Sequence, residues 1–132
     1  MSYPYSGRLP WPFPALPVVL FRDGEDAISP TLTALVDTGA DATLVPAHFL
    51  KQGNAEMIHS ARICSHWGEF RVVTLYLVDL DIASEHLAGI EVVADEQSNE
   101  VILGRNVLNK LIVLLDGPQN QIDLLLRRPR RL

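Results

Sequence analysis

The stretch Leu35-Val36-Asp37-Thr38-Gly39-Ala40 decides how the rest of this sequence is interpreted. Residues 31 to 36 are rich in β-branched and apolar side chains and predict a strand. That strand runs directly into the triplet Asp37-Thr38-Gly39, which the chain contains once. The pattern therefore predicts a strand that ends in a tight loop and presents a single carboxylate.

A second pattern lies far downstream, at Val101-Ile102-Leu103-Gly104-Arg105-Asn106-Val107-Leu108. Its apolar start predicts a short strand over residues 101 to 103, and residues 106 to 110 predict a short helix. Near the first pattern, Asp41 follows Asp37 by four positions. The two patterns in this order are a far more specific signal than either one alone.

Together these patterns resemble the retropepsins, the single-domain, retroviral-type aspartic proteases. The second signature of that family is a pair of apolar residues, then Gly-Arg-Asn or Gly-Arg-Asp, then a short helix. The resemblance covers residues 17 to 126, and its specific motifs lie at residues 35–45 and 101–108. It implies an all-β domain, a closed β-barrel of the acid-protease fold (one lobe) with one or two short helices, acting as an aspartic endopeptidase on polypeptide substrates without a cofactor.

This chemistry needs two facing carboxylates, and one copy of the chain supplies only Asp37. The resemblance therefore implies a homodimer with the active site on its two-fold axis. Two carboxylates about 3 Å apart cannot both ionise, so they share a proton and titrate as a pair. The charged carboxylate takes a proton from a water between them, while the protonated one donates to the scissile carbonyl oxygen.

The resemblance also implies roles for the residues that follow Asp37. The Thr38 hydroxyl is expected to hydrogen-bond across the dyad to the loop of the other subunit and so fix the separation. Gly39 has no Cβ and leaves room for the substrate backbone. Ala40 keeps the floor of the cleft small.

A second group consists of Asp41 and Arg105, with Gly104 immediately before the arginine. The resemblance implies an ion pair behind the loop, because a planar guanidinium matches a carboxylate; two unrelated surface charges are the alternative. The positions that match walls of the substrate pockets are Leu35, Ala42, Leu44 and Ile102. Leu35 and Ile102 fit a plain hydrophobic core equally well.

Residues 58 to 64 and 70 to 82 alternate between apolar and polar side chains and predict a hairpin. By resemblance this hairpin is the flap over the substrate, with Trp67 and Gly68 as substrate contacts near its tip. Viral flaps have glycine-rich tips, whereas this tip offers only Gly68, beside His66 and Trp67. Cys64 is expected to be half-buried and chemically quiet, with a redox-sensitive thiol as the alternative.

The ends of the chain differ from its middle. Residues 1 to 16 are rich in proline and aromatic side chains and predict an extended arm, packed on the body or on a second subunit, with disorder as the alternative. The protease domain is expected over residues 17 to 126 and a basic tail over residues 127 to 132. Unlike the viral enzymes, whose dimers interleave short termini, this chain is predicted to end in a hairpin, Leu111–Leu115 and Gln121–Leu126, before the tail.

Further strands are predicted at residues 17 to 21 and 90 to 94, and a helix from Pro46, as its first residue, to a stop at Gly53. Many short strands at regular spacing indicate a barrel-like domain.

Composition narrows the range of functions. The 132 residues, 48% hydrophobic and 20% charged, fit one globular domain. Residues 1 to 126 hold seven basic against 16 acidic side chains, which argues against a nucleic-acid-binding surface. No apolar stretch is long enough to span a membrane. One cysteine excludes an intrachain disulfide, and the four histidines lack metal-ligand spacing, so a cytoplasmic protein without a metal is expected.

Two other interpretations stay open. The chain can be a retropepsin-fold dimeric peptide-binding or scaffold domain with little or no catalysis, or a processing domain that is cut from a longer precursor. An intact Asp37-Thr38-Gly39 favours the enzyme, whereas a flap too short to cover substrate would favour binding.

Overall fold

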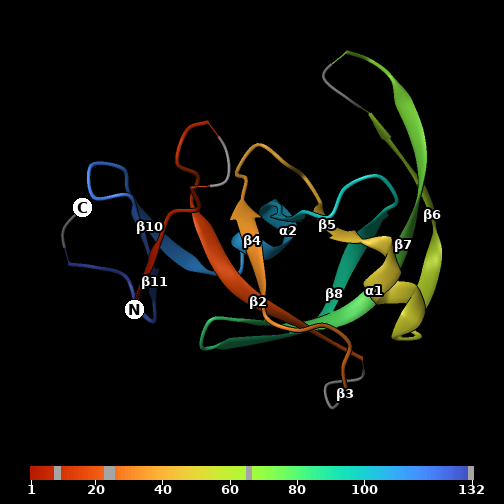
Figure 1. Cartoon of the computed structure of the whole chain (residues 1–132), viewed down its shortest axis with the longest axis horizontal. Coiled ribbons are helices and arrows are strands. Elements are labelled where there is room, and N and C mark those ends of the chain that lie inside the picture. Colours follow the sequence, from red (N-terminus) through yellow and green to blue (C-terminus); the bar gives the residue numbers. More distant parts are fainter. Residues whose placement is uncertain (8–9, 23–25, 65–66, 131–132) are drawn as a thin grey trace.

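The computed structural model describes residues 1–7, 10–22, 26–64 and 67–130 (Figure 1). Within them it places two short helices, α1 (Ala47–Gln52) and α2 (Arg105–Leu108). The strands are β1 (Ser2–Pro4), β2 (Ala15–Arg22), β3 (Asp26–Ala27), β4 (Leu32–Val36), β5 (Thr43–Pro46), β6 (Glu56–Cys64), β7 (Phe70–Ile82), β8 (Glu85–Asp95), β9 (Val101–Leu103), β10 (Ile112–Asp116) and β11 (Gln121–Leu125).

Six strands close a barrel, as the resemblance implies. They follow the order β2-β4-β9-β5-β8-β7, and β7 pairs back onto β2 over Asp79–Ile82 and Val18–Phe21. Two of the contacts are parallel, β4 with β9 and β5 with β8. The fold is therefore all-β and barrel-like, which confirms the prediction.

The alternation of apolar residues explains the barrel core. On β2 the side chains of Leu16, Val18 and Leu20 point inward and are at most 1% exposed. The second half of β7 alternates in the same way, through Tyr76, Val78, Leu80 and Ile82. Each large apolar side chain buried in this way contributes roughly 1.5–3 kcal/mol to folding.

The first half of β7 serves a different purpose. Residues 70 to 74 of β7 do not pair with β8; they pair with β6 alone, up to the pair of Cys64 and Phe70. The hairpin therefore leaves the barrel as a two-stranded ribbon, seen at the upper right of Figure 1. This confirms the predicted hairpin, whose role as a flap over substrate stays a prediction. Ser65 and His66 of its predicted tip lie outside the described residues.

The two ends of the chain meet in a second sheet of three strands, in the order β1-β11-β10. Ser2, Tyr3 and Pro4 pair with Asp123, Ile122 and Gln121 of the central strand. Tyr3 and Tyr5 also pack against the barrel core. The N-terminal arm thus lies on the body of its own chain, and the C-terminal hairpin exists as predicted.

Several boundaries differ from the prediction. Pro46 is the last residue of β5 and precedes the helix instead of opening it, because its ψ of 128° is extended. The strand predicted at residues 90 to 94 begins at Glu85. The short strands β1, β3 and β5 were not predicted, since none of them is long enough to show a period of two.

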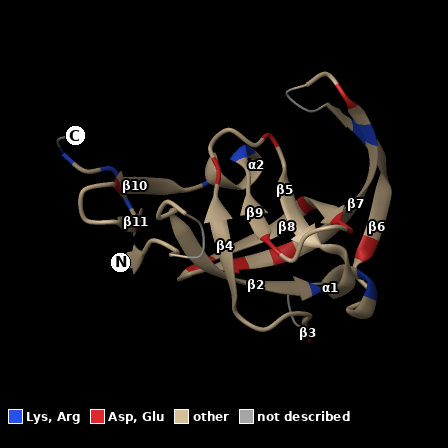
Figure 2. Ribbon diagram, turned by 45° about the horizontal axis from the view of Figure 1, so that its top comes forward, with Lys and Arg blue, Asp and Glu red and all other residues tan. Residues whose placement is uncertain are grey.

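Charge is unevenly spread in the fold. Figure 2 shows acidic residues along the β7 and β8 side of the barrel, while Lys and Arg gather at the C-terminal end. Arg127, Arg128 and Arg130 of the tail are exposed. No helix among the described residues is both long enough and apolar enough to cross a membrane.

Candidate active site

Asp37 stands immediately after β4, where the chain turns out of the barrel. Its N–H donates to the Leu103 carbonyl oxygen at 3.0 Å, and its Oδ1 accepts the N–H of Gly39 at 2.9 Å. The Ala40 N–H donates to the Asp37 carbonyl oxygen at 3.2 Å. The loop therefore holds its own carboxylate in place through a hydrogen bond from its own backbone.

The downstream motif binds the loop from behind through its backbone. The Arg105 N–H donates to the Ala40 carbonyl oxygen at 2.8 Å, and the Asn106 N–H to that of Asp41 at 3.3 Å. The two sequence patterns, more than 60 residues apart, thus form one structural unit.

The guanidinium of Arg105 adds two bonds. One donates from Nη1 to the Thr38 carbonyl oxygen at 2.9 Å, and one from Nη2 to Asp41 Oδ1. The Arg105 and Asp41 side chains are 45% and 88% exposed, so the ion pair by itself contributes at most about 1 kcal/mol. Its role is geometric, because it holds both ends of the loop at once. The pair is the one implied by the resemblance; its part in catalysis stays a prediction.

Gly104 is required at its position for a reason that the sequence does not show. A Cβ there would lie 2.2 Å from the Ala42 carbonyl oxygen and 2.9 Å from that of Ala40. Both are backbone atoms and cannot rotate away. A Cβ on Gly39 would lie 3.3 Å from Asp37 Oδ1, so Gly39 also leaves room for the carboxylate itself.

Thr43 and Asn106 are members of the site that the sequence analysis missed. Thr43 is fully buried; its Oγ1 donates to Asn106 Oδ1 at 2.8 Å and accepts the Gly104 N–H at 3.1 Å. Asn106 Nδ2 donates in turn to the Glu91 carbonyl oxygen on β8 at 2.9 Å. The signal was a threonine in an otherwise apolar strand, β5, where a buried hydroxyl needs partners.

The flap hairpin forms the opposite wall of a cleft. A cavity of about 470 Å³ lies between the loop and the end of β6. Its lining residues are Gly39, Ala40, Asp41, Ala42, Leu44, Arg62, Ile63 and Cys64. The flap is therefore long enough to reach the loop within one chain.

The predicted pocket residues divide into two groups. Ala40, Ala42 and Leu44 line this cavity. Leu35 does not; it is 5% exposed and lies in the core, which is the alternative left open for it. Ile102 is partly buried and pairs with Leu35 and Leu44 in the barrel sheet, and it is not among the residues that line the cavity.

The flap contributes residues that were not predicted. Arg62 and Ile63 line the cavity, and the Arg62 guanidinium also stacks over the Phe70 ring at 4.5 Å. Trp67 is 89% exposed and Gly68 has φ of 79°, so both stand at the tip, outside the lining within one chain. The expectation of a half-buried Cys64 is wrong, because its side chain is exposed and lines the cleft.

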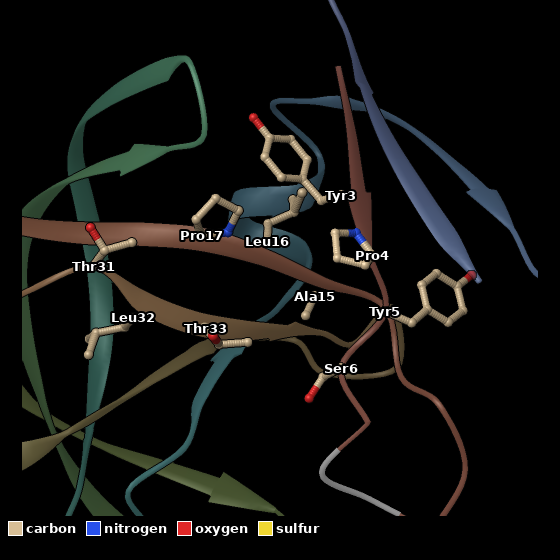
Figure 3. Close-up of a pocket in the computed structure, with 10 residues that line it drawn as sticks. All are labelled: Tyr3, Pro4, Tyr5, Ser6, Ala15, Leu16, Pro17, Thr31, Leu32 and Thr33. Atoms are coloured by element: carbon tan, nitrogen blue, oxygen red, sulfur yellow. The ribbon is translucent and has the colours of Figure 1, made fainter. Parts of the chain in front are cut away.

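Among the described residues no three His, Cys, Asp or Glu side chains gather in a way that could hold a metal ion. A second hollow, of about 400 Å³, lies between the N-terminal arm and β2 and β4 (Figure 3). Tyr3, Pro4 and Tyr5 form one side of it and Thr31 to Thr33 another. It contains no carboxylate, so we place the candidate active site at Asp37.

Comparison with solved structures identifies the fold. The chain is similar to the EIAV protease in complex with the inhibitor HBY-793, with a TM-score of 0.58 and 18% identity, over 80% of this chain and 92% of that one. It is similar to the retroviral protease-like domain of Ddi1 from Leishmania major, with a TM-score of 0.50 and 14% identity, over 83% and 87% of the two chains.

A third match is a foamy viral protease-reverse transcriptase in complex with double-stranded DNA, with a TM-score of 0.52 and 22% identity, over 73% of this chain and 15% of that one. No family model and no curated protein sequence matched this chain in the comparisons. The barrel, the flap hairpin and the paired motifs show that this chain has a retropepsin-like fold.

Proposed function

We propose that the protein is an aspartic endopeptidase that acts as a homodimer, with one Asp37 from each subunit at the two-fold axis. The observation that carries the proposal is the anchored loop: Asp37 accepts a hydrogen bond from Gly39, and Arg105 ties Thr38 and Asp41 behind it. The Asp37 carboxylate is partly exposed and lies next to Gly39 and Ala40, which line the cleft, although Asp37 itself is not a lining residue. Among the described residues no basic side chain bonds to it.

In the proposed mechanism two Asp37 carboxylates share one proton, because two adjacent negative charges repel each other. The charged carboxylate removes a proton from a water molecule, which attacks the peptide carbonyl carbon. The protonated carboxylate donates to the carbonyl oxygen, which gives a tetrahedral diol and no acyl-enzyme. The peptide C–N bond then breaks: the carboxylate that holds the proton from the water gives it to the leaving amine nitrogen, and the other carboxylate takes a proton from one hydroxyl of the diol. Thr38 is exposed at the loop, so its hydroxyl is available to the loop of the other subunit.

The substrate is an extended polypeptide segment in the cleft between the loop and the flap. Small residues, Ala40 and Ala42, leave room on the floor, and Leu44 and Ile63 supply apolar contacts. We place the protein in the cytoplasm, since its single cysteine excludes intrachain disulfide bonds.

The test is Asp37→Asn in the full chain. The substitution keeps the shape of the side chain but removes its ionisable oxygen, so cleavage of a peptide library should fall by about a thousandfold or more while the dimer persists. Undiminished cleavage by the purified variant would refute the proposed protease activity at Asp37. A wild-type dimer that binds peptides without cutting them would favour the alternative, a dimeric peptide-binding domain.

Mixing wild-type and Asp37→Asn subunits tests whether the active site is shared between two subunits. Excess Asp37→Asn subunits added to wild-type protein should lower activity by forming dimers with one functional carboxylate, and dilution through the dimer dissociation constant should lower specific activity. Activity that is proportional to wild-type concentration in both experiments would contradict a site on the dimer axis.

A further inference from the structure

The chain has two tryptophans, Trp11 and Trp67, and both side chains are largely exposed, at 81% and 89%. Tryptophan is highly buried on average in proteins, because its ring carries a large apolar surface. Trp67 belongs to the tip of the flap hairpin, where contact with substrate is already expected. Trp11 lies in a different segment, between β1 and β2, to which the candidate active site assigns no role.

The segment that carries Trp11 is closed at its base. The Ser6 N–H donates to the Phe13 carbonyl oxygen at 2.7 Å, and the Phe13 N–H donates to the Ser6 carbonyl oxygen at 3.0 Å. Just before this pair, the Tyr5 N–H donates to the carbonyl oxygen of Asn120, in the turn between β10 and β11, at 2.9 Å. Trp11 therefore stands on a loop whose two ends are joined to each other and to the body of the protein.

Prolines restrict the backbone on both sides of Trp11. Pro10 and Pro12 are its direct neighbours, and Pro14 follows two residues later. A proline ring fixes its own φ near −65° and also restricts the residue before it. An aromatic side chain on such a backbone loses little conformational freedom when it binds, which favours binding.

The Trp11 loop, residues 10 to 13, ends beside Asp37. The Pro14 carbonyl oxygen, one residue further on, accepts the N–H of Val36 at 2.9 Å. Val36 directly precedes Asp37, whose own N–H bonds to Leu103 of β9, the strand on the opposite side of β4. In Figure 1 the Trp11 loop and the loop after β4 both extend toward the top of the picture, where the tip of the flap hairpin also lies.

Chain geometry limits how far Trp11 can lie from this anchor. Trp11 precedes Pro14 by three positions, so their Cα atoms are at most about 11 Å apart. A residue a few positions from the scissile bond of an extended peptide lies about 10–13 Å from that bond. These two lengths match, so the indole is within reach of the outer residues of a peptide that is held at Asp37.

We propose that Trp11 binds a large apolar side chain of the substrate, a few residues from the scissile bond, and thereby determines specificity at that position. The inference rests on the proposed function, because Asp37 defines where the scissile bond lies. In the proposed homodimer each subunit brings one Trp11, so one indole binds at each end of an extended substrate.

The composition of the loop indicates the kind of side chain that it binds. Residues 10 to 14 are prolines and aromatics and contain no charged side chain. A charged substrate residue would lose hydration beside them without gaining a partner from these residues. A large apolar side chain instead removes exposed indole surface from water, and tryptophan is among the residues that contribute most to binding at interfaces.

The first test compares two substrate lengths. The long peptide has about ten residues and is cut near its middle, and the short one keeps only about four central residues of the same sequence. Trp11→Ala should lower kcat/KM for the long peptide about tenfold or more and leave that for the short peptide unchanged, because only the long peptide reaches the indole. Trp11→Phe should restore most of the loss, since it keeps an aromatic ring.

The matched control is Met57→Ala, another exposed apolar side chain, which lies near the start of β6 and is 64% exposed. It should leave kcat/KM for both peptides unchanged. Sedimentation of Trp11→Ala should give the wild-type dimer dissociation constant. An equal loss for both peptides, no loss for the long one, or a weaker dimer would overturn the proposal, and the last result would make Trp11 a contact between subunits.

Fluorescence tests the same contact without catalysis. Trp67→Phe leaves Trp11 as the only tryptophan, and Asp37→Asn prevents cleavage. In this double variant the long peptide should shift the emission of Trp11 to shorter wavelength, because the indole leaves water, whereas the short peptide should not. Emission that stays unchanged while calorimetry shows the long peptide to be bound would overturn the proposal.

The two experiments separate this proposal from the proposed function. The long peptide is selected from a library for cleavage or, if none is cut, for binding. A Trp11 emission that responds to it in a protein that cuts no peptide would refute the protease and retain the Trp11 contact. Conversely, a protease whose kcat/KM ignores Trp11→Ala at both lengths would retain the enzyme and refute the contact. A protein that binds no peptide would refute both.

Discussion

The Asp37 loop and the flap hairpin face each other across one cleft, yet they are held in different ways. The loop is bound to a distant segment through Arg105, Asn106 and the buried Thr43. The flap, beyond Leu75, is a two-stranded ribbon whose Val72 is 74% exposed. A two-stranded ribbon is only marginally stable by itself.

This contrast separates chemistry from recognition. Carboxylates that share a proton must be held within fractions of an ångström, which calls for the cross-braced loop. A wall that admits and covers a peptide must move, and a ribbon with few buried contacts opens at low cost. The predictions below test this difference, from the largest expected effect to the smallest.

Gly104→Ala should be the most damaging change on the loop side. The new Cβ would overlap the carbonyl oxygens of Ala42 and Ala40, so we expect a loss of about 3 kcal/mol in the free energy of unfolding, with loss of peptide cleavage. Urea denaturation measures the first and a peptide assay the second.

Gly117→Ala is the matched control, because a Cβ there meets no atom within 4 Å. It should change stability by less than about 0.5 kcal/mol. Equal stability of the two variants would show that the close approach behind the loop is not a constraint.

Thr43→Val should give an intermediate effect. The substitution keeps the shape but removes the hydroxyl, which leaves the Gly104 N–H and the Asn106 amide oxygen without a partner in a buried place. We expect the free energy of unfolding to fall by about 1–3 kcal/mol and peptide cleavage to be reduced.

The reverse substitution on the flap, Val72→Thr, should change the free energy of unfolding by less than about 0.5 kcal/mol, because the Val72 side chain is mostly exposed. If the flap variant were the less stable of the two, the contrast between braced loop and loose ribbon would be wrong.

The smallest effect concerns α1, which connects β5 of the loop side to β6 of the flap. Lys51 donates to Glu96 at 2.7 Å, and this hydrogen bond, with the charge of Glu96, raises the pKa of Lys51 above 10.5. Because the folded-state pKa is raised, the contribution to stability is fully present below pH 10.5 and is lost as the pH rises through the folded-state value.

Glu96→Gln should therefore be slightly less stable than wild type near neutral pH, and the difference should vanish in strongly alkaline solution. Both side chains are more than half exposed, so salt should weaken the effect. Unfolding curves of the two proteins at several pH values measure it, and a difference that grows above pH 10.5 would contradict the assignment.

The sequence predicted the loop and the barrel for clear physical reasons. The Asp37 triplet and Gly104-Arg105 are short motifs whose chemistry depends on residue type, and the barrel strands show a period of two because one face is buried. Even the flap hairpin could be predicted, because its alternation continues along the same strand, β7.

Other features could not be predicted because they depend on distant partners. The sequence did not predict β1, because a strand is not expected where proline is frequent. The pairing of β1 with β11 depends on residues about 120 positions away. Leu35 lies in the core, one of the two environments left open for it, and Cys64 is exposed instead of half-buried. The exposure of such a side chain depends on how the sheet curves and not on the residue type alone. Thr43 differed from its strand only in being polar, and its partner could not be named before the fold placed Asn106 beside it.

The pairing of β1 with β11 has a consequence for the order of events during synthesis. Ser2 and Asp123 are 121 positions apart, so at about 5–20 residues per second the arm waits roughly 6–24 s for its partner strand to be made. A nascent chain therefore completes its braced Asp37 loop, which needs Arg105, shortly before the terminal sheet that joins its two ends can form.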